Sequence, residues 1–109
     1  MKEILEELRK KVNERVSTNE KYRKKLEKAQ KSFCIVFDGS ASYNFSLRDG
    51  KFSEIREGET EADIRIEVSS EDFRKLLSRE LDPMTAYIEK KIKVRASLMD
   101  KLLLTELFK

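Results

Sequence analysis

The spacing of hydrophobic residues changes along this chain, and this change constrains the fold more than any other feature. In the middle of the chain, apolar and polar residues alternate one by one, which is the pattern of a half-buried β-strand. Towards both ends, apolar residues recur every three or four positions among charges, which is the pattern of an amphipathic helix. Helices and strands that are segregated in this way predict an α+β fold.

Two helices are predicted before the first strand. The first covers about sixteen residues and ends at Ser17 and Thr18, and its apolar stripe consists of Ile4, Leu5, Leu8, Val12 and Val16. Ser17 with Glu20 resembles a capping box that starts the second helix, which runs to about Gln30. The second helix is basic, and its cations are Lys21, Arg23, Lys24, Lys25, Lys28 and Lys31.

Five strands are predicted, at about 33–37, 41–47, 52–55, 62–68 and 92–96. The first is a continuous apolar run, which is typical of a strand buried on both faces. Asp49-Gly50 is a strong signal for a tight hairpin turn. Four strands in succession predict a mostly antiparallel meander. The fifth strand joins the same sheet after the connection through residues 69–91, so the complete sheet is expected to be mixed and mostly antiparallel.

That connection contains two short helices joined at Asp82-Pro83. Ser69 or Ser70 caps the first of them. Asp82 is expected to accept a hydrogen bond from a free backbone amide, and Pro83 fits the first helical position, where a missing N–H costs nothing. The turn should therefore place four apolar side chains around one corner, namely Leu77, Leu81, Met84 and Ile88.

The last helix, which Ser97 caps, is apolar around most of its circumference. Four of its sides carry apolar residues: Leu98 and Leu102, Met99 and Leu103, Leu107, and Leu104 with Phe108. Such a helix is either buried on several sides or covered by something outside the chain. A central core helix, a dimer partner and a ligand remain open as explanations.

The residue inventory excludes several kinds of chemistry. Histidine is absent, which rules out Ser-His-Asp and Cys-His catalysis and histidine metal sites. The three glycines are spaced as turns and form no phosphate-binding loop. The acidic segment with Glu54, Glu57, Glu59 and Glu61 could hold a hard cation, although a solvated loop is favoured. We therefore expect no enzyme activity, no metal site and no cofactor.

Charge and cysteine content bear on partners and location. Lys and Arg number 24 against 21 Asp and Glu, a balance that demands no polyanionic partner. The basic second helix lacks stacking aromatics apart from Tyr22, so we expect no nucleic acid but leave open a transient contact with anionic membranes. Cys34 lies in an apolar run and is expected to be buried and inert. No run is long enough to span a membrane and no signal-peptide core is seen, so we expect a soluble, cytoplasmic protein.

Four segments from Ala62 onward stand in a characteristic order and spacing: AD at 62–63, SEDF at 70–73, LDPMTAY at 81–87 and KIKV at 91–94. In these segments the sequence resembles the sterol carrier protein family, the small domains also called non-specific lipid-transfer proteins. The chain departs from the family at Arg79, Lys90 and Ala96, where members often have glycine, and it lacks the tryptophan usual in the early strands.

The resemblance implies a five-stranded sheet with helices on one face and an apolar tunnel between the layers. It also implies a single domain over residues 1–109 that carries an acyl, isoprenoid or sterol-like ligand. The candidate lining residues are Phe73, Leu77, Met84, Tyr87, Met99 and Leu103. The alternative is a protein-interaction module, homodimeric or bound to another subunit, whose apolar C-terminal helix docks on its partner.

Overall fold

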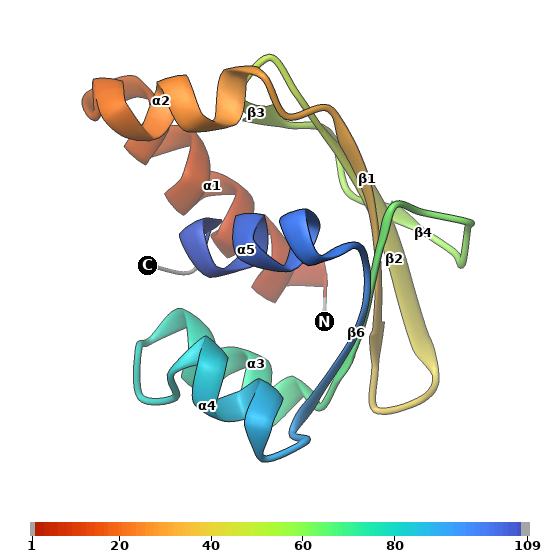
Figure 1. The fold of residues 1–109 in the computed structure, drawn as a ribbon. Helices are drawn as coiled ribbons and strands as arrows, with labels where there is room; N and C mark the ends of the chain where they lie inside the picture. Colours follow the sequence, from red (N-terminus) through yellow and green to blue (C-terminus); the bar gives the residue numbers. More distant parts are fainter. Residues whose placement is uncertain (1, 108–109) are drawn as a thin grey trace.

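A computed structural model describes residues 2–107, and it has two layers, a β-sheet and five helices on one side of it (Figure 1). The helices are α1 (Lys2–Thr18), α2 (Glu20–Glu27), α3 (Ser70–Leu77), α4 (Pro83–Ile88) and α5 (Leu98–Leu107). The strands are β1 (Lys31–Phe37), β2 (Ala41–Arg48), β3 (Lys51–Phe52), β4 (Arg56–Glu57), β5 (Ile64–Val68) and β6 (Ile92–Arg95). The predicted α+β class is confirmed. Phe108, which was predicted on the last helix, lies outside the described residues.

The sheet is mixed, as the sequence predicts. Its strand order is β3-β2-β1-β5-β6, and β4 also pairs with β2. All pairs are antiparallel except β1 with β5, which run parallel with Ile35 opposite Ile66. The predicted meander is therefore wrong for the fourth predicted strand, which pairs with β1 instead of following the third strand. The continuous apolar run thus forms a central strand, and residues 33–37 are all buried.

The predicted third strand is split into β3 and β4. Leu47 on β2 faces Phe52, whereas Asn44 faces Arg56, so one extra residue lies on the β3–β4 side between these two pairs. The side chain of Ser53 takes part in the interruption, because its Oγ accepts a hydrogen bond from Ser46 N at 2.8 Å. This is a β-bulge, which the sequence pattern did not reveal.

The core lies between the sheet and the helices. Phe33 stacks on Phe45 with ring centroids 5.0 Å apart, and Phe37 meets Phe73 of α3 edge-on at 5.2 Å. Helix α1 adds its predicted stripe, all of which is buried. In the helical layer, α2 lies at one end and α3 and α4 at the other, with α1 and α5 between them (Figure 1).

Three of the four predicted helix starts are confirmed. Ser69, Asp82 and Ser97 each accept a hydrogen bond from the backbone N–H three residues later, at 3.0, 3.0 and 3.1 Å. The predicted capping box at Ser17 is wrong. Asn19 caps α2 by accepting from Tyr22 N at 3.1 Å, while the Ser17 hydroxyl donates to the carbonyl oxygen of Glu14.

Arg79 and Lys90 lie just after the ends of α3 and α4, in the left-handed region at φ 66° and 61°. These are two of the three positions where family members often have glycine. Glycine is usual after a helix C-cap because it adopts positive φ without strain. Both chain reversals thus keep the glycine conformation with a larger residue, and Ala96 is not among the residues with positive φ.

Candidate functional site

An open cleft with a volume of about 240 Å³ lies between α3, α4, α5 and the helix-facing side of β6. Most of the side chains that line it are hydrophobic, and we refer to it as the apolar cleft. Its lining residues are Leu76, Pro83, Met84, Tyr87, Ile92, Val94, Leu98, Lys101, Leu102, Leu104 and Thr105.

The floor and one wall of the apolar cleft follow from local sequence. On β6, Ile92 and Val94 alternate with exposed residues and pair with Val68 and Ile66 of β5, which sets their side of the sheet. The Asp82-Pro83 turn starts α4 directly beside this strand, and α4 contributes Met84 to the cleft. The predicted Asp82-Pro83 turn therefore positions α4 as one wall of the cleft.

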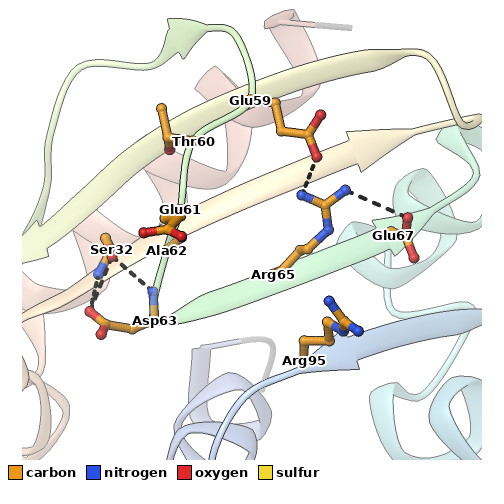
Figure 2. Close-up of a pocket in the computed structure, with 9 residues that line it drawn as sticks. All are labelled: Ser32, Glu59, Thr60, Glu61, Ala62, Asp63, Arg65, Glu67 and Arg95. Carbon is orange, nitrogen blue, oxygen red and sulfur yellow. Dashed lines mark hydrogen bonds and ion pairs between the residues drawn. The ribbon is translucent and has the colours of Figure 1, made fainter.

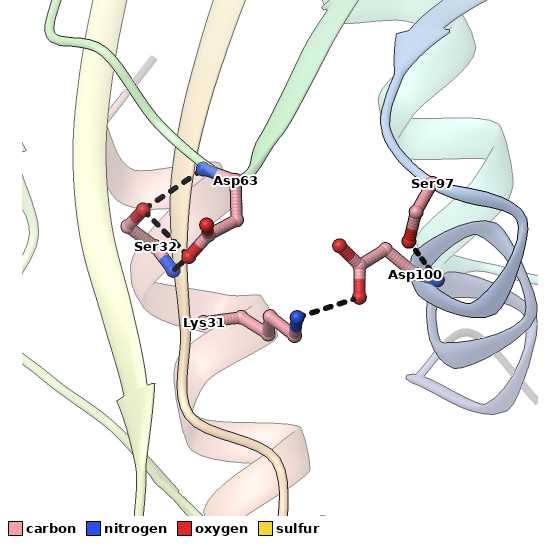
Figure 3. A network of polar contacts seen from close by, with 5 residues as sticks. All are labelled: Lys31, Ser32, Asp63, Ser97 and Asp100. Atoms are coloured by element: carbon pink, nitrogen blue, oxygen red, sulfur yellow. Dashed lines mark hydrogen bonds and ion pairs between the residues drawn. The ribbon is translucent and has the colours of Figure 1, made fainter.

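Helix α5, which forms the opposite wall, is fixed at its first turn (Figure 3). Its Asp100 is only 6% exposed, and the Asp100 carboxylate pairs with Lys31 Nζ of β1 at 3.1 Å. Ser97 Oγ accepts a hydrogen bond from the Asp100 backbone N–H. With Asp100, Leu104 and Leu107 turned inward, Leu98 and Leu102 remain exposed on the side of the cleft.

Of the described residues that line the apolar cleft, Lys101 alone is charged. Its Nζ donates a hydrogen bond to the hydroxyl oxygen of Tyr87 at 3.0 Å and lies 5.2 Å from the centre of the Tyr87 ring. Thr105, the remaining polar residue, donates its hydroxyl to the carbonyl oxygen of Lys101. The polar groups of the cleft are thus gathered where α5 meets α4.

The six residues predicted to line a tunnel have different positions. Met84 and Tyr87 line the apolar cleft. Leu77 lines a second cavity of about 450 Å³ beside α1 and α3, and Leu76 borders both cavities. Phe73 is fully buried in the core, Leu103 is half-buried against it, and Met99 is 73% exposed. Ligand contact by these residues stays a prediction.

Sequence reasoning did not select the cleft-facing residues of α5. It distinguished the side of Leu98 and Leu102 from the side of Met99 and Leu103, but an almost uniformly apolar helix does not indicate which side faces a cleft. Lys101 had one available signal, since it is the only cation between Leu98 and Leu107.

A second, larger cleft lies on the other face of the sheet (Figure 2). We refer to it as the polar cleft. It has a volume of about 1130 Å³ and is lined by Ser32, Glu59, Thr60, Glu61, Ala62, Asp63, Arg65, Glu67 and Arg95. On β5, Arg65 alternates with the buried Ile64 and Ile66, so it points away from the helices.

Most charges of the polar cleft are matched within it. Arg65 pairs with Glu59 and, at 3.8 Å, with Glu67, and the hydrogen bond to Glu59 raises the pKa of the guanidinium. The Asp63 carboxylate accepts hydrogen bonds from the backbone N–H and the hydroxyl of Ser32, at 2.9 and 3.1 Å. These bonds, the backbone one first, lower the pKa of Asp63.

Two further properties concern residues 2–107 as a whole. No group of three or more His, Cys, Asp or Glu side chains in this range is placed to hold a metal ion. No helix in the same range is long and apolar enough to cross a membrane. Cys34 is buried with a free thiol, as the sequence predicts.

Several solved structures share this fold. The crystal structure of sterol carrier protein 2 has 20% sequence identity and a TM-score of 0.69, over 96% of this chain and 90% of that one. Palmitated SCP2L2 from Aedes aegypti has 18% identity and a TM-score of 0.67, over 94% and 92%. The sec-alkylsulfatase Pisa1 from Pseudomonas sp. has 22% identity and a TM-score of 0.64, but this chain covers only 13% of it, with 79% of this chain matched.

Comparison with curated proteins and comparison with family models give different results. No curated protein matches the chain. A family model, described as the SCP-2 sterol transfer family, matches residues 2–109, which is nearly the whole chain. Because this match extends through both the N-terminal helices and the segments that form the apolar cleft, the chain belongs to the SCP-2 sterol transfer family.

Proposed function

We propose that this protein is a lipid carrier that holds the apolar chain of its ligand in the apolar cleft. The observation that carries the proposal is the exposure of hydrophobic side chains around an open cavity. Met84, Tyr87, Leu98 and Leu102 all line the cleft and are between 42% and 74% exposed. A bound chain would remove this surface from water together with its own.

The energy available is sufficient for carrier function. Each methylene transferred out of water contributes about 0.8 kcal/mol, so ten would contribute roughly 8 kcal/mol before ordering costs, which corresponds to micromolar binding. The cleft volume of about 240 Å³ lies just below the roughly 300–1,000 Å³ of typical ligand pockets. A single chain, acyl or isoprenoid, fits this volume better than a rigid sterol.

The proposed tunnel would form by joining the two cavities that Leu76 borders. One is the apolar cleft, and the other is the cavity of about 450 Å³ that includes Leu77. A displacement of the Leu76 side chain would lengthen the space available to a chain. The relative from Aedes aegypti is described as palmitated, which supports an acyl ligand in a domain of this fold.

Binding without catalysis is proposed because of the groups that line the cleft. They supply one ammonium, one phenol and one threonine hydroxyl, and none of them is a carboxylate, thiol or imidazole. The alkylsulfatase matches this chain over only 13% of its own length, so its activity is not carried over.

Leu98 and Met99 provide a matched pair of variants to test the site. They are neighbours on α5 and are 74% and 73% exposed, but only Leu98 lines the cleft. We expect an uncharged long-chain fluorescent probe to bind the delipidated wild type, Leu98→Glu to weaken binding about tenfold, and Met99→Glu to change it less than twofold. Fluorescence titration, with circular dichroism as the folding control, measures both.

Two results would overturn this assignment. If the two variants weaken binding equally, the apolar chain of the ligand does not lie in the apolar cleft. If no acyl, isoprenoid or sterol probe binds the folded wild type, and native mass spectrometry shows a lipid-free complex with a partner subunit, the interaction module is the better interpretation. The exposed Leu98 and Met99 would then be contacts of that interface.

Delivery to membranes is a separate part of the proposal, and it assumes a cytoplasmic carrier. Three of the cations of α2, Arg23, Lys24 and Lys25, pair with glutamates, whereas Lys21 and Lys28 are exposed at the same end of the molecule. Each basic residue near an anionic surface adds about 1 kcal/mol of attraction, which salt screens. We expect cosedimentation with anionic vesicles that Lys21→Glu/Lys28→Glu reduces severalfold; equal binding to neutral vesicles would contradict it.

A further inference from the structure

Lys101 is a cation without a carboxylate partner in the part of the chain that the structure describes. The two acidic residues of α5 are both engaged by other lysines: Asp100 pairs with Lys31 at 3.1 Å, and Glu106 pairs with Lys25 at 3.3 Å. Lys101 is half-buried beside hydrophobic side chains. A partly desolvated ammonium in such a place is stabilised by an opposite charge.

The second observation is the geometry around this ammonium. Lys101 Nζ donates to Tyr87 Oη at 3.0 Å, which uses one of its three N–H donors. Because Tyr87 Oη acts as acceptor in this bond, its own O–H remains able to donate. An ammonium and a phenol therefore present donors side by side between α4 and α5, within the lining of a cleft that is otherwise almost entirely apolar.

We infer that the ligand is a single-chain amphiphile with an anionic head group, carboxylate or phosphate, whose head group pairs with Lys101 while its chain lies in the apolar cleft. Lys101 is then a specificity-determining residue, and Tyr87 is a positioning residue that holds its ammonium. The inference rests on the proposed function and narrows it, because a neutral hydroxyl head group such as that of a sterol leaves the cation without a counterion.

The inference is tested by ligands that share one chain and differ in the head group. Dodecanoate, dodecyl phosphate and dodecanol displace the same uncharged fluorescent probe from delipidated protein at low salt. Without a charge partner the ionised ligands should bind more weakly than the alcohol, because their head groups are better hydrated. We expect the opposite order, with at least one anion binding about tenfold more tightly than dodecanol and this ratio falling as salt is added. The stronger anion identifies the head-group class.

The variants use this anion-to-alcohol affinity ratio as the readout, which a general loss of packing would not change selectively. Lys101→Met keeps the apolar stem and should bring the ratio to about one or below. Lys101→Gln provides a second uncharged variant if the first does not fold. Tyr87→Phe should lower the ratio about threefold. The matched control is Lys93→Met on β6, which removes an exposed lysine that does not line the cleft.

The outcomes test the assignment to Lys101 and the carrier function separately. A ratio near one in the wild type, or a high ratio that survives Lys101→Met, overturns the assignment to Lys101 while the carrier function stands. If none of the three ligands displaces the probe and no long-chain probe binds, the proposed function fails and this inference with it. A high, salt-sensitive ratio that only the Lys101 and Tyr87 variants reduce supports the inference.

Discussion

The polar cleft and the apolar cleft lie on opposite faces of one sheet. They differ in size and in whether the side chains that line them already have interaction partners. The polar cleft is the larger, at about 1130 Å³ against 240 Å³. In the polar cleft, Arg65 has Glu59 and Glu67 as partners, and Asp63 is hydrogen-bonded by Ser32. In the apolar cleft, Leu98 and Leu102 are exposed to water, and Lys101 has no carboxylate partner among the described residues.

We infer from this difference that the larger volume of the polar cleft does not make it the better candidate for ligand binding. Surface that is already paired gains little from a ligand, because a new contact has to replace an existing one. Exposed hydrophobic surface beside a cation that lacks a carboxylate partner gains from both halves of an amphiphile. The smaller cleft is therefore the better candidate site.

Two consecutive residues at the start of β1 connect the sheet to both regions (Figure 3). Side chains alternate along a strand, so Lys31 points towards α5 and pairs with Asp100, while Ser32 points to the other face and bonds Asp63. In the pair between Lys31 and Asp100, the side chains are 35% and 9% exposed, respectively. The hydrogen bond between Ser32 and Asp63 is exposed to solvent. Variants at these two pairs can therefore compare the helix-covered face of the sheet with its polar face at the same end of β1.

The largest effect is expected from Lys31→Met, which leaves the Asp100 carboxylate buried without its cation. An uncompensated charge of this kind costs several kcal/mol when fully buried, and since Lys31 is partly exposed we expect a loss of about 2 kcal/mol in the free energy of unfolding. Adding Asp100→Asn should recover most of the lost free energy of unfolding, because the buried, unpaired charge is then gone. Urea unfolding of the single and double variants measures both changes.

Lys28→Met is the control, because Lys28 is an exposed lysine just before the same strand. It should change the unfolding free energy by less than about 0.5 kcal/mol. If Lys31→Met has an equally small effect, α5 is not held by this pair, and the explanation for the position of Leu98 and Lys101 would have to come from Leu104 and Leu107 alone.

The sequence predicted what depends on local spacing. Strand β1, the Asp82-Pro83 turn and the caps at Ser69 and Ser97 are fixed by residues within a few positions of one another, and each is confirmed. The same local reasoning failed at Ser17, because Asn19 competes for the same helix start and a sequence pattern does not rank the two. The bulge at Ser53 also escaped, since it depends on pairing with Ser46 across a hairpin.

The candidate site was predicted only in part because it depends on the rotation of α5 about its axis. Met84 and Tyr87 were selected from the family-like turn and do line the cleft. On α5 the buried side includes Asp100, which pairs with Lys31, so the rotation of the helix involves a contact between residues far apart in the sequence. The positive φ angles of Arg79 and Lys90 were not predicted either, because an arginine or a lysine carries no local signal for a left-handed conformation.

The smallest effect is expected on the polar side of the sheet, at Asp63. Its pKa is lowered by the hydrogen bonds from Ser32, so the charged carboxylate stabilises the fold above the pKa of the unfolded chain, about 4, and this stabilisation is lost as the pH falls through the lower folded-state value. Because Asp63 is exposed, Asp63→Asn should cost less than about 1 kcal/mol at pH 7. The cost should shrink steadily below pH 4, as thermal unfolding across this range would show. If the stability difference between wild type and variant is instead constant from pH 7 to pH 3, the charge of Asp63 contributes nothing to stability. The donors of Ser32 would then need only an oxygen acceptor, charged or neutral.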